Sequence, residues 1–167
     1  MLNEAVVRNG KPFPPDSLAS TTIYTDAAPS VARLRHAGFL TVVVTNQPDV
    51  AKGVQSKDAV EAINAYVSEL TGVDALKVCW CLEGDDCDCY KPKPGMLLNA
   101  AEEMNIELAK SYMIGDRWRD VGAGANAGCR TIFIDRGYTE ELSIIPDVTV
   151  TTLSEAVDSI LNNSKHR

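Results

Sequence analysis

The sequence has no apolar run that approaches the length of a membrane-spanning helix, about 20 residues. It has no basic excess either: the net charge is -7 and the pI is near 4.8, so little would attract the phosphates of a nucleic acid. The first eleven residues contain no apolar h-region of a secretory signal. We therefore expect no membrane and no nucleic acid as partner, and a cytoplasmic location.

Internal repeats and low-complexity segments are also missing. The composition, 45% hydrophobic and 23% charged residues, is that of an ordinary globular protein. A length of 167 residues suits one domain with a core of its own. We expect a single domain over residues 1–167 and a monomer.

Short β-branched runs alternate with segments of helical periodicity. The predicted strands are Leu40–Thr45, Ala75–Trp80, Ser111–Ile114, Thr131–Asp135 and Val148–Val150. The predicted helices are Ala27–Ala37, Ser56–Leu70, Pro94–Met104, Asp120–Ala127 and Leu153–Leu161, followed by a frayed tail from Asn162. This alternation predicts a doubly wound parallel α/β sheet.

In such sheets, ligands bind at the carboxyl ends of the strands. Thr45, Asn46 and Asp116 follow predicted strands, and Lys91 precedes a predicted helix, so these residues converge on one rim. The Thr45 hydroxyl and nearby backbone N–H groups suit a phosphoryl oxygen, although Thr and Asn are also common turn residues. Lys91, followed by Pro92, suits an oriented cation in the same site, whereas Lys93 is expected to be solvated.

Asp116 and Asp120 are typical of a magnesium site, because Mg²⁺ prefers hard oxygen ligands. Asp116 would bind the metal directly. Asp120, four residues on, would act behind it or pair with Lys91. The structural alternative makes Asp116 a turn residue and Asp120 a favourable charge at a helix N-terminus.

Four cysteines form the pattern C-x-C-x5-C-x-C: Cys79, Cys81, Cys87 and Cys89. Four thiolates suit tetrahedral Zn²⁺ and leave no open coordination position, so a structural zinc loop over residues 79–89 is predicted. Disulfides between such close pairs and four free thiols are the weaker alternatives. The fifth cysteine, Cys129, is predicted to be a small core residue.

Arginines flank the predicted rim. Arg117 and Arg136 are candidates for binding a second phosphate of a substrate, with Arg119 beside them. Such arginines are more often solvated or paired with acids.

Three fragments, LTVVVTNQ, the cysteine loop with KPKPG, and YMIGDRWRD, together resemble the haloacid-dehalogenase-like (HAD) phosphatases. The resemblance is greatest to the small zinc-containing branch, subfamily IIIA, with heptose 1,7-bisphosphate and histidinol phosphatases. It implies a Mg²⁺-dependent phosphomonoester hydrolase acting on a small phosphorylated sugar. Thr45 and Asn46 match the second family motif, Lys91 the third, and Asp116 with Asp120 the fourth, which makes Thr45 and Lys91 the catalytic candidates.

The first family motif has no match in this sequence. Members begin their chemistry at an Asp-x-Asp that ends the central strand; the first Asp forms an aspartyl-phosphate and the second transfers protons. No Asp-x-Asp precedes Leu40, and Leu2-Asn3 matches only the stretch after that strand. We expect a sheet without its first central strand and a chain with a late start that forms no aspartyl-phosphate. The alternatives are a non-catalytic phosphate-binding relative and, for substrate, histidinol phosphate, since Tyr90 stands where many heptose bisphosphatases have arginine.

Overall fold

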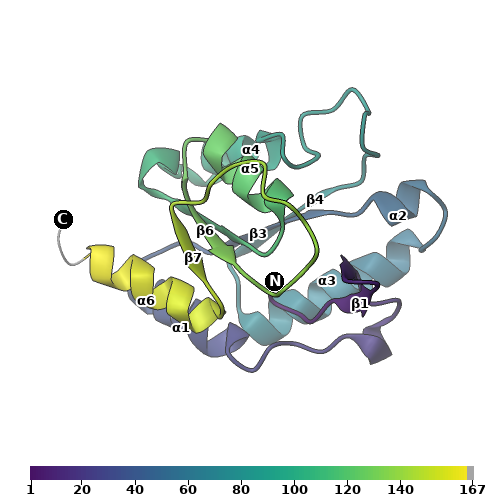
Figure 1. Ribbon diagram of the computed structural model, residues 1–167, viewed down its shortest axis with the longest axis horizontal. Coiled ribbons are helices and arrows are strands. Elements are labelled where there is room, and N and C mark those ends of the chain that lie inside the picture. The colour runs from purple at the N-terminus through teal and green to yellow at the C-terminus, as the bar shows by residue number, and fades with distance from the viewer. Residues whose placement is uncertain (165–167) are drawn as a thin grey trace.

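Helices and parallel strands alternate along the chain in the computed structural model, which describes residues 1–164 (Figure 1). The elements, in order, are β1 (Val6–Arg8), β2 (Lys11–Phe13), α1 (Ala27–His36), β3 (Val42–Asn46), α2 (Pro48–Ala51), α3 (Lys57–Thr71), β4 (Ala75–Cys79), α4 (Gly95–Met104), β5 (Tyr112–Gly115), α5 (Trp118–Asn126), β6 (Arg130–Ile134), β7 (Val148–Val150) and α6 (Leu153–Ser164). Short 3-10 turns lie at Leu18–Ser20 and Leu108–Lys110. The predicted α/β fold class is confirmed.

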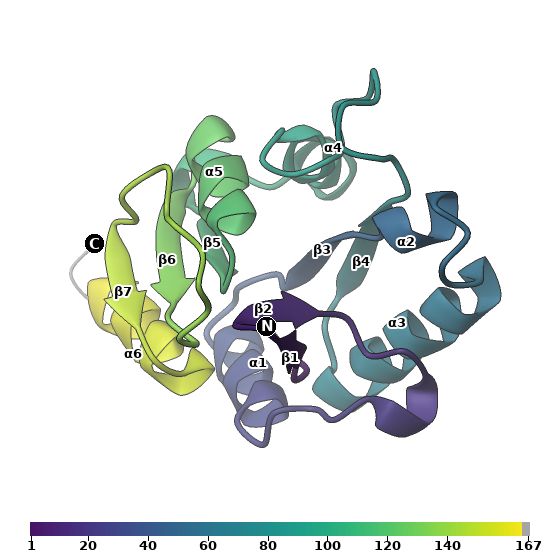
Figure 2. The ribbon, with the colours of Figure 1, turned by 45° about the vertical axis from the view of Figure 1, so that its right-hand side comes forward.

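The parallel strands form two separate sheets. β3 pairs with β4, with Val42 opposite Ala75, and β5, β6 and β7 pair in that order, with Tyr112 opposite Arg130. Within residues 1–164, β3 has no partner besides β4, and β5 none besides β6. Figure 2 shows the two sheets on either side of a gap, with β1 and β2 lying beside it. The sheet therefore lacks a strand at its centre, as predicted.

A cleft of about 660 Å³ lies between β3 and β5. The apolar core consists of two clusters, one on each face of the sheets that border this cleft. One cluster gathers buried residues of α1, α3, β6 and α6, including Val31, Ile63, Ile132 and Val157. A second cluster on the other face contains Leu97, Met113, Ala123 and Cys129. Cys129 is 8% exposed, which confirms its predicted place in the core.

Helix ends follow capping rules. The Ser56 side chain accepts a hydrogen bond from the Ala59 N–H at the start of α3, and the helix ends at Gly72 with φ of 71°, a left-handed conformation that favours glycine. Helix α6 runs to Ser164, three residues beyond its predicted end at Leu161, so the tail predicted from Asn162 is wrong over residues 162–164. Residues 165–167 of that predicted tail lie outside the described residues.

Strands β3 and β6 are each fixed at their start by an aspartate that accepts two hydrogen bonds from a threonine. The Asp74 carboxylate accepts hydrogen bonds from the N–H and hydroxyl of Thr41, each at 2.8 Å, before β3. Asp147 binds Thr131 of β6 in the same way, at 2.7 and 2.8 Å. Burial alone would raise the pKa of Asp74, but the bonds from Thr41 and the charge of Arg35 lower it. The bonds from Thr131 lower the pKa of Asp147.

The two sheets are held together behind the cleft by α1 and α6. Asp26, just before α1, accepts hydrogen bonds from the Leu153 and Ser154 N–H groups at the start of α6, at 3.0 and 3.2 Å. Arg33 of α1 forms an ion pair with Asp158 of α6. Asp26 therefore has a structural role as the cap of helix α6.

The N-terminal hairpin β1–β2 was not predicted. Val6 pairs with Phe13 and Arg8 with Lys11, around a turn in which Asn9 and Gly10 both have positive φ. Asn-Gly is the typical sequence of such a two-residue turn. The four-residue helix α2 was also missed. In the described part of the chain, no helix combines the length and the apolar character needed to cross a membrane.

Candidate functional site

The predicted polar residues do meet at one rim of the cleft. Thr45 and Asn46 end β3, Asp116 follows β5, and Lys91 and Asp120 lie between these strands; all five line the cleft. The ends of β3 and β5 lie at this rim, because Asn46 binds the Lys91 backbone and the Lys91 ammonium binds Asp120, five residues after β5. The doubly wound topology thus brings together side chains that are up to 75 positions apart, between Thr45 and Asp120.

Lys91 is held at both its backbone and its ammonium group. Asn46 Oδ1 accepts from the Lys91 N–H at 3.0 Å, and Asn46 Nδ2 donates to the Lys91 carbonyl at 3.2 Å. The Lys91 ammonium donates to Asp120 Oδ1 at 2.5 Å and to the Val44 carbonyl at 2.9 Å. Lys91 is only 9% exposed and its peptide bond to Pro92 is cis. The cation is therefore fixed in position rather than solvated.

Asp120 joins this lysine to the start of α5. Its Oδ2 accepts from the Arg117 N–H at 3.1 Å, and the residue is 7% exposed. A Cβ at Gly115 would lie 2.1 Å from the Asp120 Cβ, so glycine is required where β5 passes this carboxylate. Asp120 serves both as a capping residue and as the partner of Lys91, the second of the two roles expected for it.

Asp116 is buried at the rim, 8% exposed. Its Oδ2 lies 3.2 Å from the Met1 ammonium and accepts from the Tyr138 hydroxyl at 3.5 Å. Burial and the nearby charge of Asp116 raise the pKa of Tyr138 well above its ordinary value, so the phenol keeps its proton and remains a donor. Tyr138 was missed by the sequence analysis, since it lies in the loop between β6 and β7, which carries no periodic pattern.

The Thr45 hydroxyl is the least constrained polar group of the rim. It accepts a hydrogen bond from Gln47 Nε2 at 3.2 Å. A hydroxyl that accepts one bond can still donate its own proton to an oxygen placed above the rim.

The predicted arginines separate into two groups. Arg117 lines the cleft, and its guanidinium forms a two-pronged ion pair with Glu140, with Nε to Oε2 at 2.7 Å. Burial alone would lower the pKa of Arg117, but the hydrogen bonds that it donates to the Glu140 carboxylate raise it. Arg136 does not line the cleft: it stacks on the Tyr24 ring at 4.0 Å and donates to the Thr151 carbonyl. The structure therefore does not bring Arg136 to the rim.

Arg119 lies at the cleft as well. It contacts both oxygens of Glu83 at 2.8 Å and stacks on the rings of Trp118 and Tyr90, at 4.7 and 5.3 Å. An arginine from α5 thus lies beside Tyr90, the position where the resemblance expected a cation.

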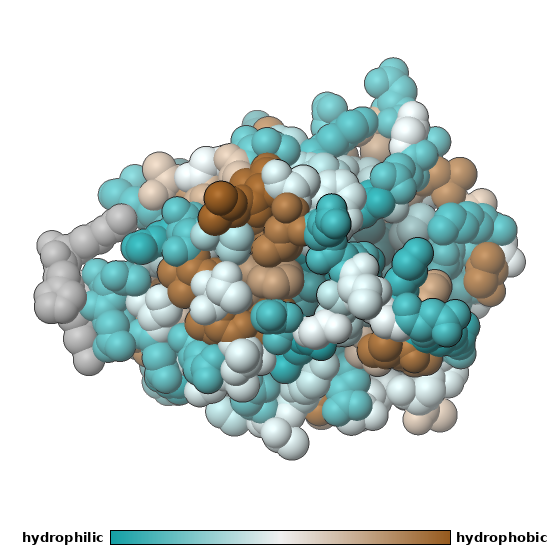
Figure 3. Space-filling model, viewed as in Figure 1, coloured by the Kyte–Doolittle hydropathy of each residue, from teal (hydrophilic) through white to brown (hydrophobic). Residues whose placement is uncertain are grey.

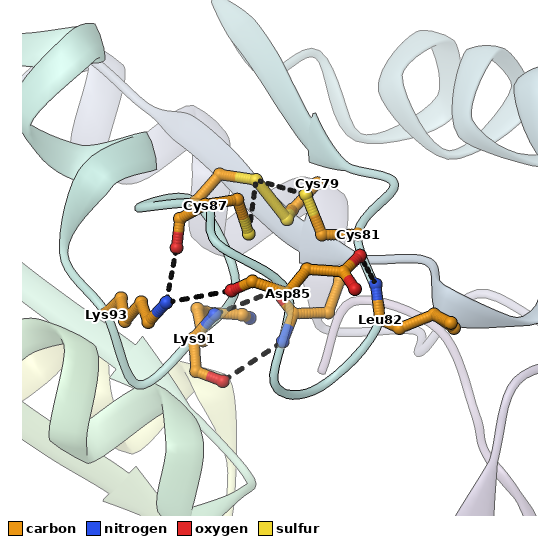
Figure 4. Close-up of a disulfide and its surroundings, with 9 residues drawn as sticks. Cys79, Cys81, Leu82, Asp85, Cys87, Lys91 and Lys93 are labelled. Atoms are coloured by element: carbon orange, nitrogen blue, oxygen red, sulfur yellow. Dashed lines mark hydrogen bonds between the residues drawn. A yellow bond between two sulfur atoms is a disulfide. The ribbon is translucent and has the colours of Figure 1, made fainter. Parts of the chain in front are cut away.

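Cys79, the last residue of β4, and the three cysteines of the loop that follows it converge; Figure 4 labels Cys79, Cys81 and Cys87 among them. Their sulfur atoms all lie within 4.8 Å of one another, with Cys81 to Cys89 at 3.6 Å and Cys87 to Cys89 at 3.8 Å. Four thiolates about 2.3 Å from a tetrahedral Zn²⁺ have sulfur–sulfur separations of about 3.8 Å, so the donor set fits zinc.

The structure joins Cys79 and Cys89 by a disulfide and leaves Cys81 and Cys87 free. A four-thiolate site requires this bond to be reduced, so zinc binding by the four cysteines stays a prediction. The pKa of Cys87 is lowered and that of Cys81 is raised, because the Cys81 thiol donates a hydrogen bond to the Cys87 sulfur. The Lys93 ammonium donates to the carbonyls of Cys87 and Asp85, so this lysine connects the end of the cysteine loop to its middle.

Three further aspartates near the cleft or the cysteine loop are already engaged. Asp16 pairs with Arg8 at 3.3 Å, and Asp85 accepts from the Leu82 N–H at 2.8 Å within the cysteine loop. Asp49 of α2 lines the cleft and is ion-paired with Lys52 at 3.2 Å. Within the described residues, the Asp49, Asp116 and Asp120 carboxylates of the cleft are therefore all ion-paired, and none of them is unengaged.

A parallel α/β sheet with Thr, Lys and two Asp residues at its carboxyl rim defines the class of HAD-like hydrolases. A family profile described as HAD-hydrolase-like matches residues 88–156. The chain is 30% identical over 151 residues to the D-glycero-beta-D-manno-heptose-1,7-bisphosphate 7-phosphatase of Vibrio cholerae, covering 81% of each chain. The chain belongs to this family of HAD-like phosphatases.

Similar proteins of other organisms share less of their length with this chain. The enzyme of the same name from Pasteurella multocida is 37% identical over 120 residues, and that from Pseudomonas aeruginosa 34% over 113 residues. The chain spans 65% and 64% of the lengths of these two relatives.

Solved structures agree on the fold. A D,D-heptose 1.7-bisphosphate phosphatase from B. bronchiseptica, complexed with magnesium and phosphate, has a TM-score of 0.81 at 24% identity, over 98% of this chain and 95% of that one. A putative HAD-like phosphatase from Mesorhizobium loti has a TM-score of 0.76 at 27% identity, over 96% and 81%.

Proposed function

We propose that this chain carries the phosphate clamp and the metal site of a Mg²⁺-dependent phosphomonoester hydrolase whose substrate is a small phosphorylated sugar of the heptose 1,7-bisphosphate type. The observation that carries the proposal is the Lys91 ammonium, buried, fixed by Asn46 and Asp120, and lying at the same rim as Asp116. The names of the relatives support this substrate.

Lys91 has the principal binding role in this proposal. Its ammonium neutralises part of the charge of a phosphoryl group at the rim, and its fixed position avoids reorganisation when the phosphate arrives. The Thr45 hydroxyl donates to one phosphoryl oxygen. Asn46 is a positioning residue, because both its polar atoms are used to hold the Lys91 backbone.

Asp116, with Asp120 behind it, fits the hard oxygen donors that Mg²⁺ prefers. Magnesium supplies charge neutralisation for the phosphoryl oxygens when it is bound. The Tyr138 hydroxyl, which keeps its proton, orients the Asp116 carboxylate.

The cysteine loop fits a structural zinc site that braces the segment leading to Lys91. Cys89 is two residues before Lys91, so a fixed loop fixes the lysine backbone as well. To bind a second phosphate, the Arg117 guanidinium must first break its ion pair with Glu140. We assign the protein to the cytoplasm as a monomer, with no nucleic acid and no membrane as partner.

Catalysis requires a carboxylate nucleophile in addition to these groups. We therefore expect the chain to bind Mg²⁺ and the heptose bisphosphate together, and to release no phosphate. The test is calorimetric titration of the purified chain with D-glycero-D-manno-heptose 1,7-bisphosphate, with and without Mg²⁺, beside a phosphate-release assay of the same sample.

The variants Lys91→Met and Asp116→Asn should each weaken binding by at least tenfold, whereas Lys110→Met, at an exposed lysine outside the cleft lining, should leave it unchanged. An affinity that neither Mg²⁺ nor either substitution changes would contradict the proposed binding site. Mg²⁺-dependent turnover by the unmodified chain would instead show that the nucleophile lies within the sequence.

A further inference from the structure

Arg119 lies beside the lysine of the proposed phosphate site, because two adjacent contacts join the same two segments. Lys91 binds Asp120 at 2.5 Å. The residue before each of these forms the second contact, in which the Arg119 Cζ atom lies 5.3 Å from the centre of the Tyr90 ring. All four residues line the cleft. Neighbouring Cα atoms are about 3.8 Å apart, so the Arg119 contact is next to the Lys91 contact on both segments.

The guanidinium of Arg119 is held by two aromatic rings. Its Cζ atom lies 4.7 Å from the centre of the Trp118 ring, in addition to the contact with Tyr90. Both distances are within the range of a cation–π interaction. A guanidinium that is held by its face keeps its N–H groups available, because these groups point outward in the plane of the guanidinium.

The edge of this guanidinium is only partly used. Nη2 donates to both oxygens of Glu83, at 2.8 Å each. Nη1 is buried and has no hydrogen-bond partner within residues 1–164. Among the charged side chains of the described chain that line the cleft, only Arg119 leaves a buried nitrogen unpaired. A buried donor without an acceptor is unfavourable, so this edge is an incomplete anion site.

The contact with Glu83 leaves room for a better ligand. An anion binds a guanidinium best when two of its oxygens meet the N–H groups of two different nitrogens. Both oxygens of Glu83 instead converge on Nη2. A phosphoryl group has three terminal oxygens, which are enough to bind Nη2 and Nη1 together. The Glu83 side chain is 66% exposed, so its carboxylate returns to water at little cost.

Arg117, the other arginine of the cleft, has less to gain from an anion. Its Nε and Nη2 already bind the two oxygens of Glu140, which is the arrangement with two different nitrogens. The Glu140 side chain is 20% exposed, so breaking this ion pair leaves a poorly solvated carboxylate behind. The exchange of a carboxylate for a phosphate is therefore more favourable at Arg119.

We propose that Arg119 binds the second phosphate of a doubly phosphorylated sugar and thereby determines the preference of this site for a bisphosphate over a monophosphate. Glu83 occupies the guanidinium until the substrate replaces it, and the Tyr90 and Trp118 rings keep the guanidinium in place. The assignment differs from that implied by the resemblance, which places the cation at the position of Tyr90. It rests on the proposed function, because the first phosphate must lie at Lys91.

The test is calorimetric titration of the full chain in saturating Mg²⁺ with two sugars. One is D-glycero-D-manno-heptose 1,7-bisphosphate, and the other is the 7-phosphate of the same heptose, which lacks only the second phosphate. We expect Arg119→Met to weaken binding of the bisphosphate at least tenfold and to change the affinity for the monophosphate less than threefold. The unchanged monophosphate affinity shows that the variant is folded and that its Lys91 site is intact.

A matched control is Arg8→Met. Arg8 also stacks on an aromatic ring, that of Phe13 at 5.5 Å, and pairs with an acid, Asp16, but it does not line the cleft. This variant removes the same charge and should leave both affinities unchanged.

A second variant, Glu83→Gln, removes the competing charge and leaves Arg119 in place. It should strengthen binding of the bisphosphate at least twofold without changing that of the monophosphate. If Arg119→Met does not fold, this titration alone decides.

Equal losses for both sugars in a folded Arg119→Met variant, or a bisphosphate affinity that this substitution leaves unchanged, would overturn this inference alone. Weaker bisphosphate binding by Glu83→Gln would do the same. Monophosphate binding that Lys91→Met leaves unchanged would instead overturn the proposed function, and this inference with it.

Discussion

The buried pair of Lys91 and Asp120 should make a large contribution to stability, and Lys91→Met tests it. The two side chains are 11% and 10% exposed, and their nearest atoms are 2.5 Å apart. Removing one partner of a buried pair costs about 3–5 kcal/mol, because the remaining charge is left uncompensated. Asp120 keeps its bond from the Arg117 N–H, so we expect the lower end, about 3 kcal/mol.

The assay is urea denaturation at pH 7, as a double-mutant cycle with Asp120→Asn. A loss of about 3 kcal/mol lowers the thermal midpoint of a chain of this size by about 6–12 °C. The double variant has no orphaned charge, so it should lose less than the sum of the single losses, with a coupling of at least about 1.5 kcal/mol. Lys110→Met removes an exposed lysine and should cost less than about 1 kcal/mol.

The reasoning fails if Lys91→Met costs no more than Lys110→Met, or if the two losses of the cycle simply add. Either result would mean that the Lys91 ammonium is solvated and does not contact the Asp120 carboxylate in solution.

The remaining predictions concern acid stability, zinc and the clamp. The pKa of Asp147 is lower in the folded protein because Thr131 donates two hydrogen bonds to its carboxylate, so its stabilisation is present above the ordinary pKa of an aspartate, about 3.9, and is lost as the pH falls through the folded value. Asp147→Asn should therefore lower the free energy of unfolding at pH 7 and flatten its decline below about pH 5 in urea titrations; an unchanged pH profile would contradict this. Elemental analysis should find about one zinc per chain purified under reducing conditions and clearly less for Cys87→Ser; equal content in both would exclude the four-sulfur site. Asn46→Ala removes the two hydrogen bonds that hold the Lys91 backbone and should cost about 2 kcal/mol, with phosphate affinity falling in parallel, so full affinity at reduced stability would count against a positioning role.

The strands and long helices could be predicted because local pattern decides them. Val42–Asn46 is an unbroken apolar run ending in polar residues, and Lys57–Thr71 has both an N-cap serine and a terminal glycine. The meeting of Asn46, Lys91 and Asp120 at one rim followed from the doubly wound topology.

Other features depend on tertiary contacts that no local pattern reports. Arg117 and Arg136 both follow a predicted strand and could not be told apart in the sequence. In the structure Arg136 stacks on the Tyr24 ring, whereas Arg117 pairs with Glu140. Tyr138 reaches Asp116 from an irregular loop. The β1–β2 hairpin did carry a local signal, the Asn9-Gly10 turn, which its short and proline-containing strands obscured.

The same irregular loop carries an exposed apolar stretch. Leu142, Ile144 and Ile145 are 36%, 36% and 93% exposed, and Figure 3 shows hydrophobic surface gathered over the middle of the face where the loop between β6 and β7 runs. The conformation of such loops depends on the surface they lie against rather than on periodicity, so the sequence predicted no helix or strand for residues 136–147.

The open sheet centre has a consequence for how the protein behaves among other proteins. Exposed strand edges usually cause sheets of neighbouring molecules to associate. Here the inner edges of β3 and β5 border the cleft, and the Lys91 ammonium binds the Val44 carbonyl on one of them. A lysine at a strand edge opposes such association, so Lys91 also makes this inner edge a poorer template for a neighbouring strand.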